Sequence, residues 1–181
     1  LPVTASAGAA DGLQVKAFYG NFSVMLKALC YLKVLGGDGL GDVGRHAVLN
    51  ANYLLHRLRQ AGYAPAYDQP CMHEFVLCLE AIKHETGVSA LDVAKAMIDH
   101  GIHPPTMYFP LIVHEALMFE PTETEDQATL ERVADIMKEI LSQARSDPQS
   151  LHEAPHNAPI GRPDEVKAAR EPVLKYQPER P

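Results

Sequence analysis

The sequence has no tryptophan and only three cysteines among its 181 residues. The cysteines, Cys30, Cys71 and Cys78, form no close CxxC pair and leave an odd number. Separated cysteines in apolar surroundings are typical of reduced, packed thiols and not of a disulfide framework. We therefore expect a protein of a reducing compartment, the cytoplasm.

Long apolar runs and an excess of basic residues are also missing. No stretch approaches the roughly 20 apolar residues of a membrane-spanning helix, and the start has neither the basic residues nor the apolar core of a secretory signal. Lysine and arginine number 16 against 23 acidic residues, a formal net charge of −7. No basic stripe offsets this charge, which disfavours binding to nucleic-acid phosphates. We expect neither a membrane nor a nucleic acid as a partner.

The first recognisable elements are two helices. Apolar residues recur closely over 22–35 and predict a largely buried helix, which Gly36 and Gly37 end. A second helix is predicted over about 40–60. Its inward residues would be Val43, Ala47, Leu54 and Leu58. The two helices together predict a helical hairpin.

A strand and a third helix follow this pair. Residues 63–70 contain two prolines and are predicted to form a strand edge or a loop. Over 72–79 apolar residues alternate between two faces, which predicts a strand covered on at least one side. Ser89 begins a helix through a capping-box pattern with Asp92, and Gly101 ends it.

Two short strands and a long helix come next. The strands are predicted over 108–113 and 116–119, with a tight turn near His114 between them. Thr124 is predicted to cap an amphipathic helix that extends to about residue 144. The element order predicts an α+β fold, in which a helical pair precedes a small antiparallel sheet packed with helices.

Composition divides the chain into four parts. They are a flexible lead (1–12), a helical segment (13–62), an α+β domain (63–146) and a proline-rich extension (147–181). The extension either wraps the domain surface or is ordered by a partner. Within it only 164–170 is predicted to form a helical turn or two, with Pro163 at its first position.

Several patterns that often carry chemistry fail on spacing or context. Four of the nine histidines precede a glutamate, but none continues to the second histidine of the HExxH zinc motif, so no metal site is predicted. The GxGxxG pattern at 39–44 follows a predicted helix and not a strand, which favours a helix connection over a dinucleotide loop. Cys71 and Cys78 have no local orienting partners, so packing accounts for them better than catalysis.

The densest group of polar residues with a plausible functional role lies in the second half of the predicted domain. His103 and Thr106 bracket a rigid Pro-Pro corner, and Tyr108 follows it. Glu120 and Thr122 lie between a strand end and a helix start, where free backbone amides favour an anion.

Several strings of the sequence resemble the C-terminal part of glycine decarboxylase, the pyridoxal-phosphate-dependent P-protein of the glycine cleavage system. The strings are AVLNANYLLHRL (47–58), HEFVL (73–77), ALDVAKAMIDHGIHPPTMYFP (90–110), ALMFEPTETED (116–126) and APHNAP (154–159). In many bacteria this enzyme is split into two polypeptides, and the chain is similar to the end of subunit 2. The similarity extends from about residue 15 to residue 176.

The resemblance implies the aspartate-aminotransferase-type fold, fold type I. Residues 13–62 would then be the end of the large domain and the interdomain connection, and 63–146 the C-terminal small domain. It also implies decarboxylation of glycine with pyridoxal 5'-phosphate, and transfer of the aminomethyl group to the lipoyl arm of the H-protein. The implied partners are glycine decarboxylase subunit 1, the lipoylated H-protein and the rest of subunit 2.

The family's Schiff-base lysine lies in a Ser-His-Lys motif, which does not occur in this sequence. We therefore expect a fragment with no catalytic residue and no bound cofactor of its own, inactive in isolation. Its expected role is to close one side of the glycine and cofactor pocket. The residues expected to form this wall are His103, Thr106, Tyr108, Glu120, Thr122, His73 and His156.

Two other interpretations stay open at the level of the sequence. One is a non-catalytic domain that serves assembly or carrier docking. The other is the small domain of a different aminotransferase-type enzyme with another amino-acid substrate. A Ser-His-Lys motif in the coding sequence upstream of Leu1 would favour the glycine enzyme.

Overall fold

The structure is a computed structural model and describes residues 19–175, so the predicted flexible lead lies outside the described residues. The chain divides into two compact units, Leu1–Gly41 and Asp42–Pro181. Helix α1, Phe22–Ala61, contributes to both. Gly36 interrupts it with φ 65° and ψ −172°, a conformation that glycine adopts without the penalty of a side chain. The predicted break between two helices is confirmed at Gly36, and the predicted hairpin stays a prediction.

The helix before Gly36 forms as predicted, but its predicted burial is wrong. Val24, Leu29 and Val34 are 61%, 49% and 85% exposed. Among the described residues, the first unit consists of one helical segment, and a lone helix cannot bury all of its apolar side chains.

The second unit contains a three-stranded antiparallel sheet in the order β1-β3-β2. The strands are β1 (Phe75–Cys78), β2 (Thr106–Met107) and β3 (Ala116–Phe119). Phe75 pairs with Phe119 across β1 and β3, and their rings stack with centroids 5.4 Å apart. The predicted α+β fold with a small antiparallel sheet is confirmed.

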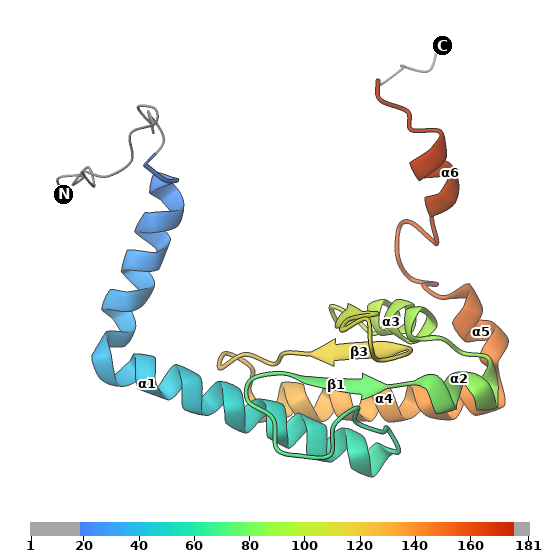
Figure 1. Ribbon diagram of the computed structural model, residues 1–181, viewed down its shortest axis with the longest axis horizontal. Coiled ribbons are helices and arrows are strands. Elements are labelled where there is room, and N and C mark those ends of the chain that lie inside the picture. Colours follow the sequence, from blue (N-terminus) through green and yellow to red (C-terminus); the bar gives the residue numbers. More distant parts are fainter. Residues whose placement is uncertain (1–18, 176–181) are drawn as a thin grey trace, which may run out of the picture. The chain divides into compact units, whose positions relative to one another are not determined.

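In the part of the chain that the structure describes, five further helices follow α1. They are α2 (Glu80–Thr86), α3 (Ala90–Asp99), α4 (Gln127–Ser146), α5 (Pro148–Glu153) and α6 (Glu165–Arg170). Figure 1 shows β1 running alongside α4, with α2 and α5 at the end where α4 finishes. No helix among residues 19–175 is both long enough and apolar enough to cross a membrane.

The core joins one face of the sheet to α1, α3 and α4. Leu58, Leu77, Met97 and Met137, one from each of these elements, have no exposed surface. The predicted inward residues of the long helix are all buried, because they recur at the helical period. They are Leu130, Val133, Ile136, Met137, Ile140 and Leu141.

The strand predicted over 108–113 is wrong. β2 comprises only Thr106 and Met107, and the chain leaves it at Tyr108, which has φ 56°. A left-handed residue turns the backbone out of the extended conformation that a strand needs. Pro110 then offers no N–H to a neighbouring strand, so the chain up to β3 is a loop and not a tight turn.

Two predicted helix starts also shift. The N-cap of α4 is Asp126, whose carboxylate accepts from the Thr129 N–H at 2.8 Å, whereas Thr124 hydrogen-bonds Thr122. In α6 the N-cap is Asp164, so Pro163 precedes the helix instead of occupying its first position.

The first part of the proline-rich extension wraps the domain. Leu151 and Ala154 are only 2% and 1% exposed and belong to the core cluster. Arg162 donates to the Ala154 and Leu151 carbonyls and to Asp92 of α3, at 2.7, 3.0 and 2.8 Å. Beyond Arg162 the described residues are exposed.

Candidate functional site

Two hollows in the second unit share the side chain of Met118. Met118 is the half-buried residue of β3, and it pairs with Thr106 of β2. We call the hollow of about 470 Å³ beside the Pro-Pro corner the first hollow. The second hollow, of about 550 Å³, lies beside residues 69–76. Together they form the candidate site.

The end of α3 shapes one wall of the first hollow. Gly101, with φ +70°, allows the Ile102 N–H to turn back to the Met97 carbonyl at 3.0 Å. The chain then runs through His103 and the two prolines into β2, because the residue before a proline favours extended geometry. This path places His103 and Thr106 on the lining.

The turn between β3 and α4 forms the facing wall of the first hollow. Glu120, Pro121 and Glu125 line it. Asn50 of α1 holds this turn, because its side-chain amide donates to the Thr122 and Glu125 carbonyls at 2.8 and 2.9 Å.

The second hollow is framed by the loop that precedes β1 and by Phe109 and Pro110. Asn52 of α1 holds the loop by its backbone at Cys71. The Asn52 amide donates to the Cys71 carbonyl at 2.8 Å, and its oxygen accepts from the Cys71 N–H at 3.0 Å. His73, two residues further on, lines the hollow.

His73 connects the two hollows through its carboxylate neighbours. Its Nε2 lies 3.9 Å from Glu74 Oε2 and 3.9 Å from Oε1 of Glu120, which lines the first hollow. All three side chains are about half exposed, so solvent screens these pairs and they contribute little to stability. His73, Glu74 and Glu120 therefore form a polar, exposed edge of the site and do little to stabilise the fold.

The linings of the two hollows also contain an arginine and a cysteine. Arg132 lines the first hollow and donates to the His100 carbonyl at 2.7 Å. Burial raises the pKa of the Cys71 thiol, which disfavours the nucleophilic thiolate. The interpretation of Cys71 as a packed thiol therefore agrees with its environment.

Four of the seven predicted wall residues meet at this site. His103, Thr106 and Glu120 line the first hollow, and His73 lines the second. Sequence reasoning did not select Asn50, Asn52, Met118 and Arg132. The two asparagines carried a weak signal, because asparagine is a poor helix former within a helix.

The other three predicted residues line neither hollow. Tyr108 lies at the strained start of the loop after β2, and Thr122 contributes its carbonyl to Asn50. His156 lies in the extension, where its N–H donates to Asp99 at 2.8 Å.

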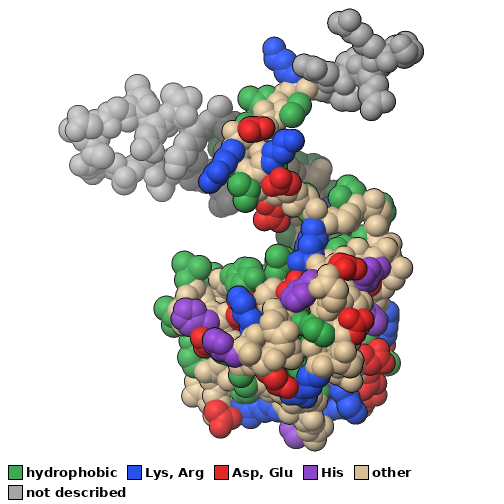
Figure 2. Space-filling model, turned by 90° about the vertical axis from the view of Figure 1, so that its right-hand side faces the viewer, with side chains coloured by type: hydrophobic (Ala, Val, Ile, Leu, Met, Phe, Trp, Pro, Cys, Tyr) green, Lys and Arg blue, Asp and Glu red, His purple; other side chains and the backbone are tan. Residues whose placement is uncertain are grey.

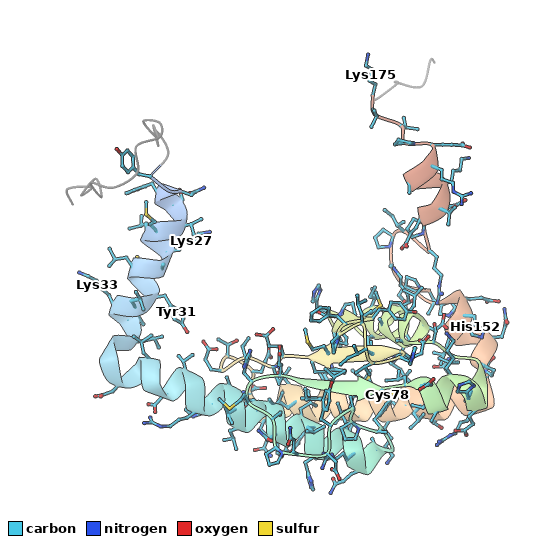
Figure 3. The ribbon with its side chains drawn as sticks, viewed as in Figure 1. Lys27, Tyr31, Lys33, Cys78, His152 and Lys175 are labelled. Atoms are coloured by element: carbon cyan, nitrogen blue, oxygen red, sulfur yellow. The ribbon has the colours of Figure 1, made fainter. Side chains whose placement is uncertain are left out.

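The hollows do not fit covalent binding of pyridoxal phosphate. No lysine occurs among the described residues that line them. Figure 3 labels Lys27 and Lys33 on α1 before its break, and Lys175 beyond α6. Over residues 19–175, no three histidine, cysteine or acidic side chains gather in a way that could hold a metal ion.

The sheet and its helices form a small α+β domain, and one of its structural relatives is a fold type I pyridoxal-phosphate enzyme. That relative is the crystal structure of glycine decarboxylase (P-protein) of the glycine cleavage system, in inhibitor-bound form. The TM-score is 0.55 at 26% identity, over 64% of this chain and 25% of that chain. The chain belongs to the family described as "Glycine dehydrogenase, C-terminal domain", whose sequence model matches residues 43–159.

Curated relatives carry the description "Probable glycine dehydrogenase (decarboxylating) subunit 2". The protein of Treponema denticola is 60% identical over 164 residues, which cover 91% of this chain and 34% of the relative. The proteins of Desulforamulus reducens and Thermotoga maritima are 52% and 48% identical, covering 92% and 91% of this chain and 34% of each relative. The predicted family is confirmed, and the chain spans about a third of the length of these relatives.

Proposed function

We propose that the chain is the C-terminal third of a glycine dehydrogenase (decarboxylating) subunit 2, and that the two hollows form one wall of its active site. The observation that carries the proposal is the family match over residues 43–159, which contain both hollows. In the complete enzyme, glycine would lose its carboxylate as carbon dioxide. The aminomethyl group would pass to the lipoyl arm of the H-protein, with subunit 1 as a further partner.

Pyridoxal phosphate would supply the electron sink for decarboxylation. The residues of the hollows do not provide the lysine that anchors it, so the anchor belongs to another part of the enzyme. This chain would contribute shape and polar contacts. The Pro-Pro corner fixes the backbone between His103 and Thr106, which suits side chains that must hold a substrate in one orientation.

We also propose that the helix before Gly36 belongs to the preceding large domain of the longer polypeptide. The matched C-terminal domain begins at residue 43, and the second compact unit begins at Asp42. The apolar side chains of residues 22–34 are exposed in this chain. A contiguous exposed apolar surface marks a place where another part of a protein packs.

A second candidate function, assembly or carrier docking without chemistry, finds support in one loop. Leu111 and Ile112, between β2 and β3, are 86% and 81% exposed. Two adjacent exposed aliphatic side chains suit a contact with another polypeptide. In the complete enzyme this contact and the wall function are compatible.

The coding sequence upstream of Leu1 tests the proposed function most simply. We expect a large domain with a Ser-His-Lys motif in the same reading frame. An upstream sequence without that motif would favour the docking function instead. We expect the complete enzyme in the cytoplasm, which fractionation of the source cells would check.

A further inference from the structure

Two asparagines on α1 each hold one wall of the candidate site. Asn50 donates to two carbonyls of the turn after β3, and Asn52 donates to and accepts from the backbone of Cys71. These partners lie 72, 75 and 19 residues away in sequence. These long-range contacts therefore fix tertiary geometry, and the Asn52 amide also donates to the Val48 carbonyl of α1 at 2.8 Å.

Helix geometry explains how one helix serves both walls. Residues two apart on an α-helix point about 200° apart, so Asn50 and Asn52 project from nearly opposite sides. One turn further along α1, Leu54 lines the first hollow and Leu55 lines the second. Asn50 thus lies one turn before Leu54 of the first hollow, and Asn52 lies one turn before Leu55 of the second.

The two walls meet where His73 faces Glu120. His73 follows the loop that Asn52 holds, and Glu120 precedes the turn that Asn50 holds. Their closest atoms are 3.9 Å apart, and both side chains are more than half exposed. Such an exposed pair cannot fix its own geometry, because screened surface pairs contribute only about 0–1 kcal/mol.

We propose that Asn50 and Asn52 are positioning residues that set the spacing of the two walls and thereby the orientation of Glu120 and His73. Neither asparagine lines the two hollows of the candidate site, so each acts through the backbone that it holds. The proposal rests on the proposed function only where it concerns catalysis. The spacing itself is a property of this chain.

Amide hydrogen exchange on the 181-residue chain tests the spacing directly. In Asn50→Asp the side chain keeps its shape but can no longer donate to the two carbonyls. We expect faster exchange over residues 120–126 and unchanged exchange over 69–74. In Asn52→Ala the expected pattern is the reverse. Tyr53→Phe on the same helix removes a hydrogen bond to Glu131 of α4 and should leave both walls unchanged.

Turnover tests the consequence in a hybrid enzyme, in which this chain replaces the matching third of the Treponema denticola subunit 2. The hybrid enzyme is assembled with that organism's subunit 1 and lipoylated H-protein. Misplacing a wall by about 1 Å can cost up to about a hundredfold in rate. We expect kcat/KM for glycine to fall at least about tenfold in Asn50→Asp and in Asn52→Ala. The change in melting temperature of each variant should be no larger than that of the control Tyr53→Phe.

The outcomes separate the two proposals. Exchange that rises equally over both walls, or turnover that falls no further than in Tyr53→Phe, would overturn the positioning role. If the unsubstituted hybrid enzyme has no turnover, the proposed function fails. The exchange measurements on the chain still decide whether the asparagines set the walls.

Discussion

At the scale of single residues, the candidate site contains two kinds of side chain. Some lie on a backbone that prolines make rigid, and others lie next to backbone that asparagine side chains hold by hydrogen bonds. His103 and Thr106 take their positions from the two prolines between them and from the pairing of Thr106 with Met118. Both are exposed in this chain, so neither contributes much to the stability of the fold. Function and stability can therefore be separated by substitution.

His103→Ala or Thr106→Ala in the hybrid enzyme should lower turnover by about tenfold or more while changing the free energy of unfolding by less than about 0.5 kcal/mol. The reason is that each side chain faces the first hollow and not the core. Steady-state kinetics and urea unfolding of the same preparations provide the measurement. Parallel losses in both would indicate a structural role.

Asp92 is the one residue of strongly polar character buried in the described core, at 5% exposure. Burial would raise its pKa, but hydrogen bonds from Ser89 and Arg162 outweigh burial, and the pKa is lowered from 3.8. His152, labelled in Figure 3, lies 3.3 Å from the same carboxylate. A carboxylate with a lowered pKa stabilises the fold above its unfolded pKa and loses that contribution as the pH falls through the folded pKa.

Arg162→Ala should therefore lower the free energy of unfolding by about 1–3 kcal/mol at pH 7, since a charged hydrogen bond to a buried group is lost. The difference from the unsubstituted chain should fade at acid pH, as the pH falls through the lowered pKa of folded Asp92 and its carboxylate becomes protonated. Urea unfolding at pH 7 and at successively lower pH measures it. Arg170→Ala on the exposed helix α6 is the control, and a pH-independent difference would contradict the account.

At the scale of elements, the pattern of apolar residues predicted the helices and strands whose buried side chains recur at the helical or the strand period. The stripe of α4 and the β1 face with Phe75 and Leu77 are predicted correctly because these apolar residues face one core. Val76, on the other face of β1, is buried as well. β2 was misplaced because nothing in the local sequence shows that Tyr108 is left-handed. Helices α2 and α5 were missed because each is short and is held by packing on other helices, α2 on α4 and α5 on α3 and α4.

In the candidate site, too, the sequence predicted the local features and missed the contacts between distant segments. His103, Thr106 and Glu120 were found because a Pro-Pro corner and a strand-to-helix turn are local features. Their common hollow, and the link from Glu120 to His73, depend on the antiparallel pairing of β1 with β3. Asn50 and its partners at 122 and 125 are too far apart in sequence for a local pattern to join them.

The extension provides a test at this scale. A chain that ends after Ser146 loses Leu151 and Ala154 from the core. We expect it to unfold at a clearly lower temperature, since removing one large buried aliphatic side chain alone costs about 2–5 kcal/mol. A chain that ends after Pro163 keeps these residues and Arg162 and should melt like the full chain. Differential scanning calorimetry of both chains decides, and equal melting of all three would contradict the wrapped extension.

The loop between β2 and β3 provides a second test. Leu111→Ser with Ile112→Ser should leave the stability of the chain within about 0.5 kcal/mol, because both side chains are exposed. The loop is held elsewhere, through Glu115, whose carboxylate accepts from the Ala90 N–H at 2.7 Å and pairs with Lys83. In the hybrid enzyme, the double substitution should weaken assembly, measured by analytical ultracentrifugation. Unchanged assembly would remove this loop as a contact.

At the scale of the whole molecule, the chain joins a folded C-terminal domain to a helix whose apolar side chains are exposed. The domain has its own core, a three-stranded sheet and an extension bound back through Arg162. Figure 2 shows the face that lies on the right-hand side of Figure 1, where basic, acidic and histidine side chains are interspersed. A surface of mixed charge suits solvent, whereas we propose that the exposed apolar side chains before Gly36 pack against another domain.

We propose that this chain supplies one wall of a glycine-decarboxylating site whose lysine lies in the preceding part of the polypeptide. Release of carbon dioxide from carboxyl-labelled glycine by the hybrid enzyme tests it most directly. We expect release that depends on glycine, pyridoxal phosphate and the H-protein, and no release from this chain alone. A folded and fully assembled hybrid enzyme that releases no carbon dioxide would contradict it.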